Sequence, residues 1–370
     1  MDYWLEGPLI VGGCLRAENY DFNTLGGVDC SSGSEPEISD HGLVVFGDTE
    51  VFNIAVNGHG ALRGGSSDTS AIQKLTSGCQ VQTFSEYWGD TTISDAEDAA
   101  LRASVIFSNY LPNYVMDSRG TVTKMRDTTR DEFAVFTFDP CDSSTVFCVP
   151  PLSSLHYSDA SGFLYNDDST FNGLQGDLPP EGVTVVFNIP ILHGTDLTIL
   201  NNKIAKSVTS PCHTIFNIYP VDMAGNYHFS DGIVFYRDFA GIMPGFILAP
   251  RVSIVDSANG YFQGQIVGNS YQWASDSPGA NIRRFDQSPQ LYPFTVYVRE
   301  PTKTVLTGAT VTISPHKKEK HHDKVKEWGK KKYSEWDHKK EDYDNWDTGK
   351  YGWSEKGGGY NRDWKEDKKW

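Results

Sequence analysis

Two stretches decide the fold of this chain: Thr184-Val185-Val186-Phe187-Asn188-Ile189 and Thr214-Ile215-Phe216-Asn217-Ile218. Each is apolar at consecutive positions, which is typical of a strand buried on both faces in a stack of parallel strands. An asparagine follows the phenylalanine in both stretches. In a stacked coil, Asn188 and Asn217 would point inward and hydrogen-bond to neighbouring backbone; the alternative is an ordinary asparagine near a turn. Together, the two stretches predict parallel β structure.

Short apolar runs of the same kind recur along residues 1–300. Examples are residues 42–47, 133–138, 245–250 and 264–268, each rich in β-branched or aromatic residues and bordered mainly by Gly, Asp or Pro. Such runs are typical of strands joined by tight turns. Their spacing is irregular, so there is no strict solenoid repeat. We expect a mainly β domain of the solenoid type over residues 1–314.

One segment departs from the strand pattern. Ser94-Asp95-Ala96-Glu97 has the form of a capping box, in which a serine cap is followed three residues later by glutamate. Apolar residues then recur at helical spacing: Ala100, Ala103, Ile106, Phe107, Tyr110 and Leu111. Pro112 ends the pattern. We expect one α-helix over about 95–111 that caps the β structure or packs against it.

The net charge of −16 is unevenly distributed over the 370 residues. Residues 315–370 contain 16 Lys or Arg and 13 Asp or Glu, a net of +3, so residues 1–314 carry −19. An acidic body repels phosphate, which argues against nucleic acid as the main partner. No apolar stretch is long enough to span a membrane. The first six residues lack the basic and apolar regions of a leader peptide, so a secreted form would need a leader absent from this numbering.

The six cysteines lack a CxxC motif and a Cys/His ligand spacing, which favours disulfides over zinc. They are Cys14, Cys30, Cys79, Cys141, Cys148 and Cys212. A bridge between Cys141 and Cys148 would close a short local loop, but the pairing as a whole stays open. Disulfides imply an oxidising, extracellular location; the alternative is a cytosolic protein with buried free thiols.

Several motifs together resemble the choice-of-anchor A domain. They are Ile10-Val11-Gly12-Gly13, the helix, 184–189, 215–222, 245–254 and Gly264-Gln265-Ile266-Val267-Gly268. The likeness covers roughly residues 8–298, and the Leu-Ala-Pro at 248–250 followed by 264–268 is its most specific part. It implies a right-handed β-solenoid of adhesive type on a cell-surface or cell-wall protein, and it implies no catalytic residues.

Motifs for the common enzyme classes are absent: there is no Gly-x-Ser-x-Gly, HExxH, P-loop or dinucleotide fingerprint. Some β-solenoids degrade polysaccharides with clustered carboxylates. The candidates here are Asp167, Asp168 and Asp177, and Asp29, Glu35, Glu37 and Asp40. Both groups lie in Ser/Gly-rich sequence typical of solvated loops, so we expect no enzyme activity. No cofactor is expected, with structural calcium at these carboxylates as the one alternative. Ice binding would need a longer threonine array than Thr121-Val122-Thr123.

Residues 315–370 form a tail of different character. More than half are charged, aliphatic residues almost vanish, and a tyrosine-then-tryptophan unit recurs. Such a segment cannot bury a core and should be disordered alone. Aromatic rings among lysines supply stacking and cation–π contacts; a merely solubilising tail or a Glu/Lys helix are the alternatives. The expected contact residues are Trp328, Tyr333, Trp336, Tyr343, Trp346, Tyr351, Trp353, Tyr360 and Trp364.

Three classes of function remain. The leading one is a secreted, non-enzymatic surface protein with an adhesive or structural role, whose tail attaches to cell-wall or matrix polysaccharide or to other copies of the chain. A glycan-binding module is the second, because exposed aromatic rings stack on sugars. A polysaccharide-degrading enzyme is the third.

Overall fold

The computed structural model describes residues 3–26, 30–31, 40–63, 69–84, 90–126, 133–139, 141–142, 147–148, 157–165, 171–199, 202–208, 210–274, 277 and 279–284. All of them fall within the compact unit Met1–Ser314. The tail therefore lies outside the described residues.

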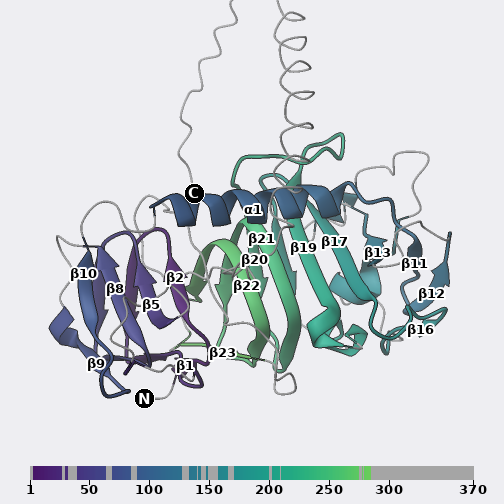
Figure 1. The fold of residues 1–370 in the computed structure, drawn as a ribbon. Helices are drawn as coiled ribbons and strands as arrows, with labels where there is room; N and C mark the ends of the chain where they lie inside the picture. The colour runs from purple at the N-terminus through teal and green to yellow at the C-terminus, as the bar shows by residue number, and fades with distance from the viewer. Residues whose placement is uncertain are drawn as a thin grey trace, which may run out of the picture. The chain divides into compact units, whose positions relative to one another are not determined.

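The first part of the chain winds into short coils of parallel strands (Figure 1). Three sheets form their sides. The first contains β1 (Tyr3–Leu5), β4 (Tyr20–Phe22), β7 (Ile54–Val56) and β9 (Ile72–Lys74). The second contains β2 (Leu9–Val11), β5 (His41–Val45), β8 (His59–Arg63) and β10 (Val81–Phe84). The third contains β3 (Leu15–Glu18) and β6 (Thr49–Phe52).

Helix α1 (Asp90–Ser108) follows these coils and packs against strands from the second half of the chain (Figure 1). The helix predicted over about 95–111 is confirmed, and it begins and ends a few residues earlier than predicted. Ser94 lies inside the helix rather than at its cap, since the turn before it is also helical. At the end of the helix, the side chains of Ser108 and Asn109 both donate to the carbonyl oxygen of Val105, which also accepts the main-chain N–H of Asn109. No helix in the described ranges is long and apolar enough to cross a membrane.

The second part of the chain supplies the longest strands. They are β13 (Phe133–Thr137), β17 (Thr184–Leu192), β19 (Thr214–Val221), β21 (Ile242–Asp256), β22 (Tyr261–Trp273) and β23 (Asn281–Arg283). Each pairs in parallel with the next, and β23 also pairs with β1, which joins the two halves in one 12-stranded sheet. β18 (Asp196–Ile199) and β20 (Ile233–Arg237) extend this sheet from the end of β21. The predicted fold, a mainly β domain of the solenoid type, is confirmed.

Smaller elements complete the described structure. They are β11 (Tyr114–Met116), β12 (Thr121–Lys124), β14 (Cys141–Asp142), β15 (Phe147–Cys148), β16 (Gln175–Gly176), the 3-10 turns Thr69–Ala71, Ile204–Ser207 and Pro211–His213, and the π-turn Ser161–Tyr165.

Stacked phenylalanines fill the interior of the second half. Phe136, Phe187 and Phe216 are neighbours in register on β13, β17 and β19, are fully buried, and have ring centroids 5.2 and 5.4 Å apart. The next residue along β17 and β19 faces the opposite way, because side chains alternate along a strand. Asn188 and Asn217 therefore face α1, where they are fully buried and donate to main-chain oxygens of the helix, so neither is an ordinary asparagine near a turn.

Candidate functional site

Strands β18, β20 and the ends of β21 and β22 form a second face of the solenoid, distinct from the strands beneath α1. Their register aligns side chains in rows across the four strands. One row, Leu197, Phe235, Ile254 and Tyr271, is buried in the interior. The next row faces outward and consists of Thr198, Tyr236, Val255 and Gln272. We call this outward surface the open face.

Arg237 and Asp256 lie side by side in the row behind the open face and are both fully buried. The guanidinium of Arg237 forms a salt bridge with Asp256, which also accepts a hydrogen bond from the hydroxyl of Tyr271. Burial raises the pKa of Asp256 to about 6, although Arg237 and Tyr271 favour its ionised form. A buried charge needs such partners, since an unpaired one would cost several kcal/mol, roughly 3–5.

The remaining N–H groups of Arg237 hold the adjoining loops. They donate to the main-chain oxygens of Phe239 (3.1 Å), Asn259 (2.6 Å) and Ser257 (2.7 Å). The guanidinium thus ties the corner after β20 to the turn after β21. Arg237 is a positioning residue, because these two loops carry the polar side chains at the surface.

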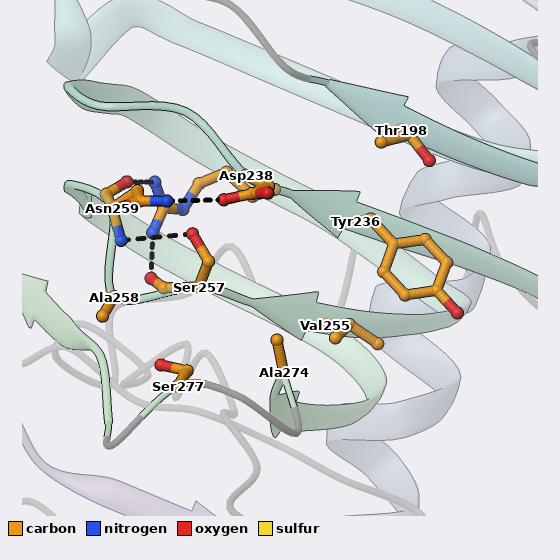
Figure 2. Close-up of a pocket in the computed structure, with 10 residues that line it drawn as sticks. Thr198, Tyr236, Asp238, Val255, Ser257, Ala258, Asn259, Ala274 and Ser277 are labelled. Atoms are coloured by element: carbon orange, nitrogen blue, oxygen red, sulfur yellow. Dashed lines mark hydrogen bonds between the residues drawn. The ribbon is translucent and has the colours of Figure 1, made fainter.

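A hollow of about 440 Å³ lies on the open face at this point (Figure 2). Figure 2 shows Asp238, Ser257 and Asn259 gathered at one end, and Tyr236 with Thr198 and Val255 at the other. We call this hollow the groove. It is lined by Thr198, Tyr236, Arg237, Asp238, Val255, Ser257, Ala258, Asn259, Ala274 and Ser277.

The polar end of the groove is held in one arrangement by hydrogen bonds. Asn259 donates from its side-chain amide to Asp238 over 2.8 Å, and its main-chain N–H lies 3.2 Å from the Ser257 hydroxyl oxygen, which accepts from it. The hydrogen bond from Asn259 lowers the pKa of Asp238, and the Ser257 hydroxyl and the charge of Arg237 act in the same direction. Asp238 is therefore ionised at neutral pH and accepts hydrogen bonds at the surface.

Tyr236 supplies the apolar end. Its side chain remains 36% exposed and lies beside the buried Val255. A partly exposed ring presents an apolar face and a polar hydroxyl. The groove thus combines a ring, a carboxylate, an amide and hydroxyls, a set that can stack on and hydrogen-bond to a hydroxyl-rich ligand.

Of the carboxylates considered from the sequence, only Asp40 and Asp177 belong to the described part of the chain. Asp29, Glu35, Glu37, Asp167 and Asp168 lie outside the described residues. Asp177 accepts a hydrogen bond from the main chain of Lys124 (3.3 Å). Among the residues with described side chains, no group of three or more His, Cys, Asp or Glu gathers as metal ligands.

The cysteines are partly placed. Cys30 and Cys79 form a disulfide with a Cα–Cα distance of 4.9 Å, which links the segments before β5 and after β9. The backbone register sets Cys141 opposite Cys148 in the antiparallel pair β14–β15, as a local bridge would need. Cys14 and Cys212 are exposed. The predicted contact residues of the tail lie outside the described residues.

Sequence reasoning missed Arg237 and Asp256. A signal for Arg237 was present, because Ile233, Phe235 and Arg237 occupy the same alternating phase of one strand, which places the arginine inside. Asp256 lies opposite Arg237 only through the register of β20 and β21. It therefore cannot be identified as the partner of Arg237 unless the pairing of these strands is known. The groove was missed because its residues come from separate turns.

A family model described as "Putative Ice-binding-like adhesive domain" matches residues 5–279. The match supports the adhesin-like domain inferred from the motifs, without naming the choice-of-anchor A domain. No curated protein and no solved structure matches the chain significantly.

Proposed function

This chain belongs to the ice-binding-like adhesive domain family. From that membership we propose that it is a non-enzymatic adhesive protein of the cell surface and that its groove binds polysaccharide. The groove carries this proposal. Its ring and fixed polar groups suit the apolar C–H face and the hydroxyls of a sugar. The disulfide between Cys30 and Cys79 supports an extracellular location, where disulfides persist.

The open face favours a polysaccharide over an ordered lattice. Its outward row contains Thr198, Tyr236, Val255 and Gln272, which differ in size and polarity. A repeating lattice needs a repeating side chain, whereas a flexible sugar chain needs one shaped contact. The row therefore supports a glycan as the ligand.

We propose that the tail, residues 315–370, also contributes to attachment. Its tyrosines and tryptophans would add many weak contacts to the same polymer or to the acidic body of another copy, and such contacts gain strength in number. Because salt screens charge attraction more than stacking, binding should fall but persist at about 1 M salt. Replacing Trp336, Trp346, Trp353 and Trp364 together by alanine in the full chain should lower the persisting part and leave the contribution of the groove, whose ring and hydrogen bonds salt also screens little. If this variant binds as strongly as the wild type at high salt, the aromatic residues of the tail have no role in attachment.

Sedimentation with insoluble polysaccharides tests the groove. The full chain would be mixed with particles of peptidoglycan, amorphous chitin, amorphous cellulose or β-glucan, and bound protein and released soluble sugar would be measured. We expect binding to at least one polymer without sugar release, and an affinity about tenfold weaker for Tyr236→Ala, equivalent to ~1.4 kcal/mol.

Phe52→Ala is the matched control, because Phe52 is an aromatic residue 66% exposed on β6, away from the groove. It should bind like the wild type. Equal losses in the two variants would refute the groove as the contact site, and released sugar would identify an enzyme.

A further inference from the structure

A pair of adjacent histidines, with ring planes tilted by 34°, lies at the corner where the strands beneath α1 turn toward the open face. His193 follows β17 and His228 precedes β20. Their main-chain N–H groups donate to two consecutive residues of β19, His193 to Val221 (2.8 Å) and His228 to Pro220 (2.9 Å). These bonds hold the two rings together, with centroids 4.0 Å apart.

One nitrogen of each ring approaches the same hydroxyl. The Ser230 oxygen lies 3.2 Å from His193 Nε2 and 2.8 Å from His228 Nδ1. The main-chain oxygen of Asp231 is 3.1 Å from His193 Nε2. Two imidazole nitrogens and two oxygens therefore meet at one point of the surface.

Gly232 keeps this point open. A Cβ atom at this position would lie 2.6 Å from His193 Nε2, and its φ of +146° also disfavours a side chain. Two carboxylates lie near this point: Asp222 interacts with His228, and Asp231 is paired with Arg251 at 3.4 Å.

We propose that this corner binds one divalent transition-metal ion through His193 Nε2 and His228 Nδ1. Neutral imidazole is a preferred ligand of zinc, nickel and copper. Small rotations of the two partly exposed rings bring both nitrogens to the ~2.1 Å of a metal–nitrogen bond. Ser230 or the Asp231 carbonyl supplies a third ligand, and water completes the shell. Calcium, which takes oxygen ligands, does not bind here.

Thermal unfolding of the full chain, stripped of metal and then given NiCl₂ or ZnCl₂, tests the site. The tail contains further histidines, so total metal uptake is not diagnostic. An ion that binds the folded domain raises its melting temperature, which makes that temperature the readout. We expect a rise with either metal, no rise with CaCl₂, and loss of the rise in the double variant His193→Asn/His228→Asn.

His213→Asn is the control, because His213 is an exposed histidine of the same domain away from the pair. It should keep the full rise. A wild type without any rise, or a double variant that keeps it, would overturn the site.

The imidazole ¹⁵N resonances of the wild type give a second measurement that needs no variant. On addition of ZnCl₂, those of His193 and His228 should shift together at one equivalent of metal. A response confined to other histidines would contradict the proposal.

Discussion

Asn217 donates a hydrogen bond from its side-chain amide to the side-chain oxygen of Asn188, 2.8 Å away, and both residues are fully buried between the sheet and α1. Each also donates to a carbonyl oxygen of the helix: Asn217 to Ser104 (3.0 Å) and Asn188 to Phe107 (2.7 Å). The Ser104 hydroxyl returns a hydrogen bond to Asn217 (2.7 Å). This network attaches α1 to the sheet, because asparagine side chains of the sheet bond to the backbone of the helix.

Asn217→Leu should lower the free energy of unfolding by about 2–4 kcal/mol, because the buried side-chain oxygen of Asn188 loses its donor from Asn217 and the Ser104 hydroxyl keeps only its contact with Tyr227. Urea unfolding measures this change. Asn172→Ala, at an exposed position, should stay within about 0.5 kcal/mol of the wild type. A loss at Asn217 no larger than at Asn172 would mean that the network contributes nothing.

Phe187→Ala should cost about 3–5 kcal/mol, because the ring is fully buried in the stack between Phe136 and Phe216 and leaves a cavity. Phe52→Ala removes the same atoms from an exposed position and should change stability little. The comparison by urea unfolding separates burial from residue type. Similar values for the two variants would contradict the observed core.

Loss of the disulfide should destabilise the domain. Cys30 and Cys79 are 49 residues apart in sequence, and the chain-entropy estimate for closing a loop of that length is about 4 kcal/mol. Cys30→Ser/Cys79→Ser should therefore unfold at lower urea than the wild type. Peptide mapping of non-reduced protein checks the bond itself, and recovery of both as free thiols would exclude it.

Asp256 should make stability depend on pH in an unusual direction. Its pKa is raised to about 6 in the folded protein by burial, above the ~3.9 of an unfolded aspartate. Between these values the folded state binds more protons, so the free energy of unfolding should fall as pH rises from about 4 to 6, by up to about 2–3 kcal/mol. Asp256→Asn should remove this fall. If the free energy of unfolding of the wild type instead rises relative to that of Asp256→Asn between about pH 4 and 6, the pKa of Asp256 is not raised in the folded protein.

The architecture of the second half was predictable because its strands are apolar at consecutive positions, and a strand of that kind is stable only where both of its faces are buried. The coils of the first half were harder to recognise, although Asn19 and Asn23 are matched 34 residues later by Asn53 and Asn57. Asn19 and Asn53 have φ values of +54° and +49°, and asparagine tolerates such corners better than most residues. This spacing was a readable repeat.

The groove could not be predicted, since it depends on which strands are neighbours. Tyr236 and Asp238 are close in sequence, but Asn259 reaches Asp238 only because β20 pairs with β21. The helix bounds failed for a local reason, since a capping sequence also occurs inside helices. The alternation of Ile233, Phe235 and Arg237 predicts a buried arginine, but it does not identify the carboxylate that pairs with it.

Hydroxyl-radical footprinting of the full chain, free and bound to the polysaccharide that retains it best, tests the groove as the adhesive contact most directly. Tyr236 is 36% exposed, and Met223 and Phe229 are 67% and 57% exposed elsewhere on the domain, so all three should react in the free protein. On binding, we expect Tyr236 to be protected and the reactivity of Met223 and Phe229 to stay unchanged. Protection of Met223 or Phe229 with Tyr236 still reactive would contradict it.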